Sequence, residues 1–205
     1  MNEQASVLIR PYRIDDASLL FNAARESISE MMHWMPWCHP QYSYNESQSW
    51  IEAQVAAFTR REAFAFGIVS DDGSYLGGCG LSRIDQGNRR ANLGYWVRST
   101  ATGRGVATAA TRLLRDWGFE NCDLIRLEIV IAVGNLASQR VAEKAGAIRE
   151  GTLRNRLVLH GQPHDAVMFS FVTSRLLAPG QFPSFRAENS GRFLSQKFPL
   201  TSFAA

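Results

Sequence analysis

The middle of the chain alternates between strand-type and helix-type segments, and this alternation restricts the possible folds more than any other feature. Three short runs rich in branched and aromatic residues lie at 63–70, 75–85 and 90–99. The turn sequences DDG and QGN separate them, which is typical of strands that pair as an antiparallel meander. The centre of the chain therefore predicts a sheet whose neighbouring strands are close in sequence.

Segments on both sides of the meander extend this sheet and cover it. A strand-type run at 6–12 comes first, and helix-type runs at 15–35 and 47–61 follow it. Ser43 and Glu46 have the spacing of a capping box at the start of the second helix. After the meander, a helix, a strand, a shorter helix and a hairpin are predicted at 106–117, 124–133, 135–146 and 153–177. The element order is β-α-α-β-β-β-α-β-α-β-β, which predicts a mixed α/β domain on one central sheet.

The length and composition predict one domain with an appendage. The chain has 205 residues, of which 45% are apolar, so it can bury a sizeable core. We predict a single domain over residues 1–177. From residue 178 the composition shifts toward Pro, Ser, Phe and Gln, so residues 178–205 are predicted to form a tail with little regular structure.

The charge of the chain argues against a nucleic-acid-binding protein. Lys and Arg number 22 against 19 Asp and Glu, a net charge of +3, and the basic residues are scattered. No apolar run has the length of a membrane span, and the N-terminal residues lack the apolar core of a signal peptide. We therefore expect a cytoplasmic protein that binds neither nucleic acid nor membrane.

The cysteines and histidines do not have the spacing of a metal site or a disulfide framework. Cys38, Cys79 and Cys122 are an odd number of cysteines, which indicates free thiols in a reducing compartment. The four histidines show no ligand-like spacing. We therefore predict that the protein holds no metal.

A glycine-rich loop precedes the helix-type run at 106–117. Backbone N–H groups converge at a helix start, the helix dipole favours negative charge there, and glycines allow the backbone to approach an anion. The P-loop pattern is missing, and the dinucleotide pattern fails because Thr108 occupies its third glycine position. The loop predicts a phosphate site of another kind, or alternatively only a tight turn between a strand and a helix.

The segments around this loop together resemble the GNAT superfamily of N-acetyltransferases, and within it the RimJ/RimL-like branch. Gly105 and Ala107 match the last two positions of the family's coenzyme loop, whereas Thr102 stands where a basic residue is usual. Further matches are Asn135, Ser138, Lys144 and Gly146 of the Asn-x-x-Ser and Lys-x-Gly signature, the final hairpin, and HWMPW at 33–37. The resemblance covers about residues 6–175 and implies a mostly antiparallel sheet of about seven strands flanked by helices.

This resemblance implies acetyl-coenzyme A as a co-substrate and transfer of its acetyl group to a primary amine. The pyrophosphate would lie on the amides of 103–108, and the pantetheine arm would fill a gap between the strands at 93–98 and 127–133. A backbone N–H near Trp96 or Val97 would polarise the thioester carbonyl. The coenzyme-binding residues implied in this way are Trp96, Val97, Arg98, Gly103, Arg104, Gly105, Val106, Ala107, Thr108, Asn135, Ser138 and Lys144.

Ser138 and Glu128 are the candidate catalytic residues. The resemblance suggests that the Ser138 hydroxyl lies near the sulfur, where the departing thiolate needs a proton or a hydrogen bond. Alternatively, Ser138 only supports the start of its helix. Where the branch often carries a glutamate this chain has Asn92, which cannot take up a proton at neutral pH. Glu128 is then the best carboxylate for a base, against the alternatives of an ion pair with Arg126 and of proton loss through ordered water.

The acceptor favoured by the resemblance is the N-terminal α-amine of a protein, such as a ribosomal protein. A small-molecule amine (an antibiotic, an aminoacyl nucleotide, a polyamine) and a non-enzymatic acyl-coenzyme A binder or sensor are the alternatives. Trp34, Trp37 and Tyr42 either wall an acceptor groove or fasten the helices to the sheet, and with Asn92 they are the predicted substrate-binding residues. We include a homodimer among the expected assemblies. The tail is predicted either to cover the acceptor groove or to contribute to a dimer contact.

Overall fold

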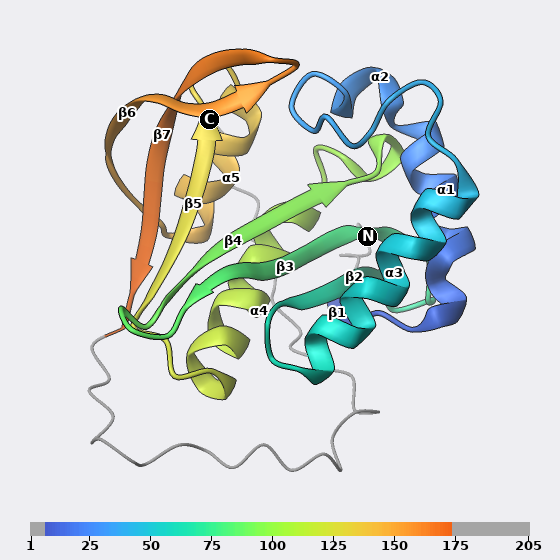
Figure 1. Ribbon diagram of the computed structural model, residues 1–205, viewed down its shortest axis with the longest axis horizontal. Coiled ribbons are helices and arrows are strands. Elements are labelled where there is room, and N and C mark those ends of the chain that lie inside the picture. Colours follow the sequence, from blue (N-terminus) through green and yellow to red (C-terminus); the bar gives the residue numbers. More distant parts are fainter. Residues whose placement is uncertain (1–6, 174–205) are drawn as a thin grey trace, which may run out of the picture.

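Seven strands form one sheet in the order β1-β2-β3-β4-β5-β7-β6 (Figure 1). The computed structural model describes residues 7–173, so the tail predicted at 178–205 lies outside the described residues. The strands are β1 (Val7–Pro11), β2 (Phe64–Ser70), β3 (Tyr75–Asp85), β4 (Arg90–Val97), β5 (Arg126–Ala132), β6 (Ile148–Leu159) and β7 (Gln162–Val172). Only β4 and β5 pair in parallel, so the expected mostly antiparallel sheet of seven strands is confirmed.

Helices cover both faces of this sheet. They are α1 (Ala17–Glu26), α2 (Ile28–Met31), α3 (Tyr44–Thr59), α4 (Val106–Asn121) and α5 (Leu136–Ala145). In Figure 1, α3 lies in front of the sheet with α1 beside it at the right, and α4 lies behind the sheet. The alternation of β2 explains this arrangement, because successive strand side chains point to opposite faces. Phe66 packs into the core shared with α4, whereas Ala65 packs against residues of α1 and α3.

The first predicted helix, 15–35, is interrupted at Ser27. This residue leaves the helical region, with φ −107° and ψ 8°, and separates α1 from the short helix α2. Its hydroxyl donates to Ala23 O at 2.7 Å and accepts from the N–H of Ser99 at 3.0 Å. A serine that bonds the carbonyl four residues earlier tends to bend a helix. The break was not visible in the sequence periodicity because its other partner, Ser99, is distant in the chain.

β4 and β5 pair at one end only. Their register contains Arg90–Arg126, Ala91–Leu127 and Asn92–Glu128, and beyond Asn92 the two strands diverge (Figure 1). β4 stays paired with β3 as far as Val97, and β5 stays paired with β7 as far as Ala132. The gap therefore opens between two strands that stay paired on their other edges, at the place that the family resemblance implied.

The aromatic core fixes α4 in relation to this gap. Trp117 lies 4.8 Å from Phe66 and 5.0 Å from Phe64, measured between ring centroids. Burying one such ring contributes about 1.5–3 kcal/mol, so this cluster holds the C-terminal half of α4 on the sheet. The N-terminus of α4 is then directed to the end of β4 that borders the gap.

Candidate active site

A cavity of about 160 Å³ occupies the gap between β4 and β5. Residues 92–95 of β4 and 129–132 of β5 line it without interruption. Both strands therefore contribute consecutive residues to the cavity, at the edges where they no longer pair with each other. Asn135 and Ser138 at the start of α5 also line it, as do Trp34 and Met35 after α2 and Leu157 and Leu159 of β6.

Ser138 and Tyr95 meet at one wall of this cavity. The Tyr95 hydroxyl lies 2.9 Å from the backbone oxygen of Ser138 and 3.0 Å from its Oγ. Asn135 caps α5, since its Oδ1 accepts from the N–H of Ser138 at 3.1 Å. The Ser138 side chain is therefore not needed to cap its helix. Burial raises the pKa of Tyr95 to about 12, so Tyr95 is a neutral hydroxyl at physiological pH.

Tyr95 was not among the residues expected from the sequence. It precedes Trp96 in a run of strand type, and nothing in that pattern shows which helix its side chain meets. The only available signal was alternation, which places neighbouring residues of a strand on opposite faces.

Polar contacts to α1 and α2 hold the segment that follows β4. Thr100 donates its N–H and its hydroxyl to Glu26 Oε1, at 3.2 and 2.7 Å. Ser99 donates its hydroxyl to Glu30 at 2.7 Å. Thr102, at the position of the expected basic residue, donates its hydroxyl to Ser99 O at 2.8 Å. These contacts give the loop a defined backbone in front of α4, and the sequence pattern contained no sign of them.

At the start of α4, backbone groups and not side chains are available to a ligand. Gly105 occupies the N-cap position with φ +79°, and no side chain caps the helix there. Gly103 has φ +74°, so two left-handed glycines shape the loop. The N–H groups of a first helical turn have no acceptor within the helix. Ala107 and Thr108 are half-buried, whereas the Val106 side chain packs into the core, so only its backbone can face a ligand.

The strand pattern distinguishes between the two N–H groups considered for the thioester carbonyl. The N–H of Arg98 donates to Leu76 O at 2.9 Å, toward β3. Successive N–H groups of a strand point to opposite edges, so the N–H of Trp96 also faces β3. The N–H groups of Val97 and Tyr95 therefore face the gap, whereas that of Trp96 does not.

The three basic residues among the expected coenzyme contacts lie in different places. The Arg98 guanidinium pairs with Glu26 and donates to Tyr75 O at 3.1 Å, so it ties β4 to α1. Arg104 is exposed in the loop before α4. Lys144 is exposed in the last turn of α5, about 9 Å along the helix from Ser138. Arg104 is the one of these three that belongs to the loop itself.

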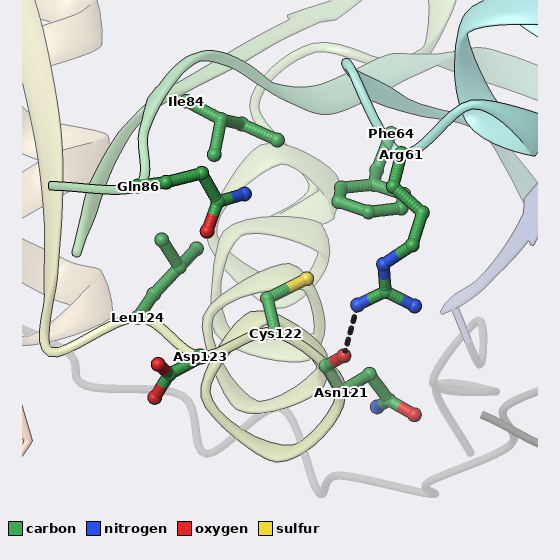
Figure 2. Close-up of a pocket in the computed structure, with 8 residues that line it drawn as sticks. All are labelled: Arg61, Phe64, Ile84, Gln86, Asn121, Cys122, Asp123 and Leu124. Atoms are coloured by element: carbon green, nitrogen blue, oxygen red, sulfur yellow. Dashed lines mark hydrogen bonds between the residues drawn. The ribbon is translucent and has the colours of Figure 1, made fainter. Parts of the chain in front are cut away.

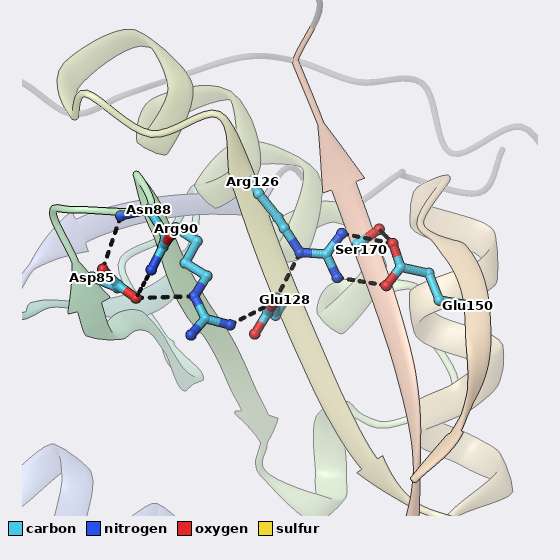
Figure 3. Close-up of polar contacts among 7 residues, drawn as sticks. All are labelled: Asp85, Asn88, Arg90, Arg126, Glu128, Glu150 and Ser170. Atoms are coloured by element: carbon cyan, nitrogen blue, oxygen red, sulfur yellow. Dashed lines mark hydrogen bonds and ion pairs between the residues drawn. The ribbon is translucent and has the colours of Figure 1, made fainter.

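Glu128 lies beside the gap, opposite Asn92, and its carboxylate is engaged by two arginines (Figure 3). It accepts from Arg126 Nε at 2.8 Å and from Arg90 Nη1 at 3.4 Å. The ion pair with Arg126 that the sequence left open is therefore present. Asn92 lines the cavity, whereas Glu128 is not among the residues that line it.

The same network continues across the sheet (Figure 3). Arg126 donates to Glu150 at 2.6 Å, and Ser170 donates its hydroxyl to the same carboxylate at 2.6 Å. These contacts, chiefly the one from Arg126, lower the pKa of Glu150 to about 2. At the other end, Arg90 donates to Asp85 at 3.2 Å. The charged chain joins β3 to β6 across the closed end of the gap and holds these strands in register.

The tryptophans of the segment after α2 lie in two different places. Trp34 lines the cavity, and a Cβ on Gly134 would lie only 3.2 Å from its ring. Trp37 packs against Tyr42 and Trp96, with ring centroids 5.5 and 5.7 Å apart. Trp34 therefore borders the gap, whereas Trp37 and Tyr42 pack together on the other side of this segment and line a separate pocket with Trp96.

Another cavity, of about 250 Å³, lies at the opposite end of α4 (Figure 2). Cys122 and Phe64 line it, and Arg61 donates to Asn121 O at 3.1 Å beside it. Burial raises the pKa of the Cys122 thiol to about 12, so it is protonated at neutral pH. α4 has 16 residues and is about 24 Å long, which separates this cavity from Gly105. It is not part of the candidate site.

Two further observations concern the described part of the chain. Among residues 7–173, no three His, Cys, Asp or Glu side chains gather in a way that would hold a metal ion. Within the same residues, no helix has the length and apolar character needed to cross a membrane.

Comparisons with known proteins agree with this geometry. The family model described as "Acetyltransferase (GNAT) domain" matches residues 6–148. A Bacillus subtilis (strain 168) protein named "Putative ribosomal N-acetyltransferase YdaF" is 42% identical over 101 residues, which are 49% of this chain and 55% of that protein. The chain thus matches little more than half the length of the first curated relatives.

Two solved structures extend the likeness over most of the fold. A "Probable acetyltransferase" is 31% identical, with a TM-score of 0.75 over 83% of this chain and 94% of that chain. "Mycobacterium smegmatis RimJ in complex with CoA-disulfide" is 26% identical, with a TM-score of 0.75 over 81% of each chain.

Proposed function

Because the chain belongs to the GNAT acetyltransferase family, we propose that it transfers the acetyl group of acetyl-coenzyme A to the N-terminal α-amine of a protein. The observation that carries this proposal is the cavity in the gap between β4 and β5, with Ser138 and Tyr95 on its wall. The names of the relatives favour a ribosomal protein as acceptor, since YdaF is named as a ribosomal N-acetyltransferase.

The residues present fit acetyl-coenzyme A. Gly105 has a left-handed backbone and begins α4 without a side-chain cap, so the amides of the first turn are available to the pyrophosphate. Unpaired strand edges border the gap and suit the pantetheine amides. When bound, acetyl-coenzyme A supplies the acetyl group as an activated thioester. The solved structure of Mycobacterium smegmatis RimJ, which is similar to this chain, is a complex with a coenzyme A disulfide and supports this assignment.

Two groups of the chain are placed to stabilise charge as the thioester reacts. The N–H of Val97 faces the gap and would donate to the carbonyl oxygen, where negative charge develops. The Ser138 hydroxyl lies on the cavity wall and would donate to the departing sulfur. Tyr95 would orient this hydroxyl from 3.0 Å away.

The acceptor amine must be neutral before it attacks. No carboxylate or imidazole of the described residues lines the cavity. Asn92 lines it at the position on β4 where the family branch often carries a glutamate. An α-amine titrates near about 8, whereas a lysine amine titrates near about 10, so an α-amine needs less help to lose its proton. The absence of a base from this cavity lining therefore favours an α-amine and proton loss to water. Glu128, held by Arg126 and Arg90, remains the alternative base.

Free-thiol release with acetyl-coenzyme A and a panel of peptides tests the proposal. We expect turnover on peptides with a free N-terminus, with the acetyl group found on the α-amine by mass spectrometry. Matched peptides with a blocked N-terminus and an internal lysine are the control. Tight binding of coenzyme A without turnover on any amine would instead identify an acyl-coenzyme A sensor.

A further inference from the structure

A second pocket, of about 300 Å³, lies on the α1–α3 face of the sheet. Three indole rings wall it, those of Trp37, Trp50 and Trp96. Trp37 and Trp50 are each 40% exposed, which is unusual for two large rings that share one pocket. The acetyl transfer proposed above gives this pocket no role.

The rings hold one another in fixed orientations. Trp37 and Trp96 meet at 69° with centroids 5.7 Å apart, and Tyr12 meets Trp50 at 88° and 5.2 Å. Tyr75 lies 6.0 Å from Trp96 and connects the two ends of the cluster, since it also bonds the Tyr12 hydroxyl at 2.6 Å. Edge-to-face contacts of this kind restrict ring rotation. The pocket is therefore formed before any ligand arrives.

One carboxylate completes the pocket. Glu46 precedes Trp50 by four residues on α3, so both side chains lie on the same side of the helix. Its Oε2 accepts from the N–H of Ser43 at 2.9 Å and from the Ser43 hydroxyl at 2.7 Å, and its Oε1 lies 2.8 Å from His39 Nε2. Ring faces beside an ionised carboxylate attract an organic cation. An uncharged apolar ligand would gain nothing from Glu46.

The pocket and the cavity between β4 and β5 are close neighbours. Met35 lines the cavity and Trp37 lines the pocket, and two residues of extended chain span at most about 7 Å. Tyr95 and Trp96 are likewise consecutive in β4, with one facing each site. The two sites are therefore separated by only a few residues of β4 and of the segment after α2.

We propose that this pocket binds a second, cationic group of the acceptor, an ammonium or guanidinium, while the amine to be acetylated lies in the cavity between β4 and β5. The inference rests on the proposed function. A basic side chain close to the N-terminus of a protein and the distal amine of a diamine offer the same chemistry, and the experiment separates them.

The test compares acceptors that carry or lack a terminal cationic group. One pair of peptides carries trimethyllysine or norleucine at the second position, and one pair of amines is (5-aminopentyl)trimethylammonium and hexylamine. The trimethylated cation cannot itself be acetylated. We expect kcat/KM to be about tenfold higher for the cationic member of one pair, chiefly through a lower KM. The pair that shows the preference identifies the source of the cation.

Three variants of α3 make the comparison specific. Trp50→Leu removes a ring face, and Glu46→Gln removes the charge while glutamine still serves a capping box. Both should abolish most of the preference and leave turnover of the neutral acceptor within about twofold. Glu52→Gln, an exposed carboxylate of the same helix, is the matched control and should change nothing. Equal kcat/KM for both members of each pair, or a preference that survives both pocket variants, would overturn the proposal.

A binding measurement separates this inference from the proposed reaction. Tetramethylammonium should shift the indole N–H signals of the wild-type protein in NMR spectra, and tert-butanol should not. The shift should weaken in Glu46→Gln. If these shifts appear and no amine is acetylated, the proposed reaction is wrong and the cation pocket stands. If the amines are acetylated without these shifts, the cation pocket is wrong.

Discussion

The hydroxyl of Tyr95 lies 2.9 Å from the backbone oxygen of Ser138 and 3.0 Å from its Oγ. A tyrosine has one proton to donate, so it can serve only one of these oxygens fully. When it donates to Oγ, the serine proton is left for a group in the cavity. When it donates to the backbone oxygen, the serine can donate to Tyr95 instead. Tyr95 therefore controls the direction in which Ser138 donates.

Tyr95→Phe should lower kcat by about tenfold and change coenzyme affinity little, because it removes the partner of Ser138 and keeps the ring. Steady-state kinetics with direct titration of coenzyme A measures both quantities. Ser70→Ala, which removes a hydroxyl bonded to Ser74 O at 3.2 Å in the turn after β2, is the control and should leave kcat within about twofold. Unchanged kcat in Tyr95→Phe would remove this residue from the mechanism.

Ser138→Ala should lower kcat by at least about a hundredfold, more than it weakens coenzyme binding, if its hydroxyl protonates the departing sulfur. The double variant Tyr95→Phe with Ser138→Ala should be no slower than Ser138→Ala alone, since the tyrosine acts through the serine. A double-mutant cycle of kcat values provides the measurement. Additive losses would show that the two hydroxyls act independently.

Gly105→Asp should reduce the affinity for acetyl-coenzyme A by more than tenfold, because it adds a side chain and a negative charge at the start of α4. Gly73 lies in the turn after β2 with φ +83° and open space around it, so Gly73→Asp carries similar backbone strain and the same added charge outside the start of α4. Calorimetric titration of coenzyme A should detect loss of binding only in Gly105→Asp. Equal affinity in the two variants would contradict the assignment of the loop.

Glu128→Gln should lower the free energy of unfolding by about 1–2 kcal/mol and leave kcat within about twofold, because the carboxylate holds Arg126 and Arg90 at the closed end of the gap. Urea unfolding and steady-state kinetics measure the two effects. The exposed Glu52→Gln is the control. A tenfold loss of kcat with unchanged stability would instead identify Glu128 as the base.

Glu26 should make folding stability depend on pH in acid. Its pKa is lowered from 4.5 to about 2, chiefly by Arg98 and then by Thr100. The folded state then binds fewer protons than the unfolded state, so the stabilisation is complete above about pH 4.5 and is lost as the pH falls toward 2. Glu26→Gln should be less stable than wild type in urea at pH 7, and this difference should shrink at pH 3. A difference independent of pH would contradict the role of the charge.

The local elements of this protein follow from the sequence alone. Ser43 and Glu46 form the predicted capping box, Asn135 caps α5, and Gly146 ends it with φ +93°. The order of strands and helices also agrees with the prediction. These features depend on spacing, side-chain alternation and glycine backbone freedom, which act over a few residues.

The tertiary structure decided how these elements meet. Only the placement of α5 beside β4 brings Tyr95 to Ser138. Only the pairing of β5 with β4 adds Arg90 to the ion pair that Arg126 and Glu128 form within β5. Trp34 and Trp37 are three residues apart, yet one reaches the cavity between β4 and β5 and the other reaches the aromatic pocket. Sequence determined which groups are present on each element. Contacts between distant elements determined their chemistry, because hydrogen-bond partners and burial are set by neighbours that no local pattern specifies.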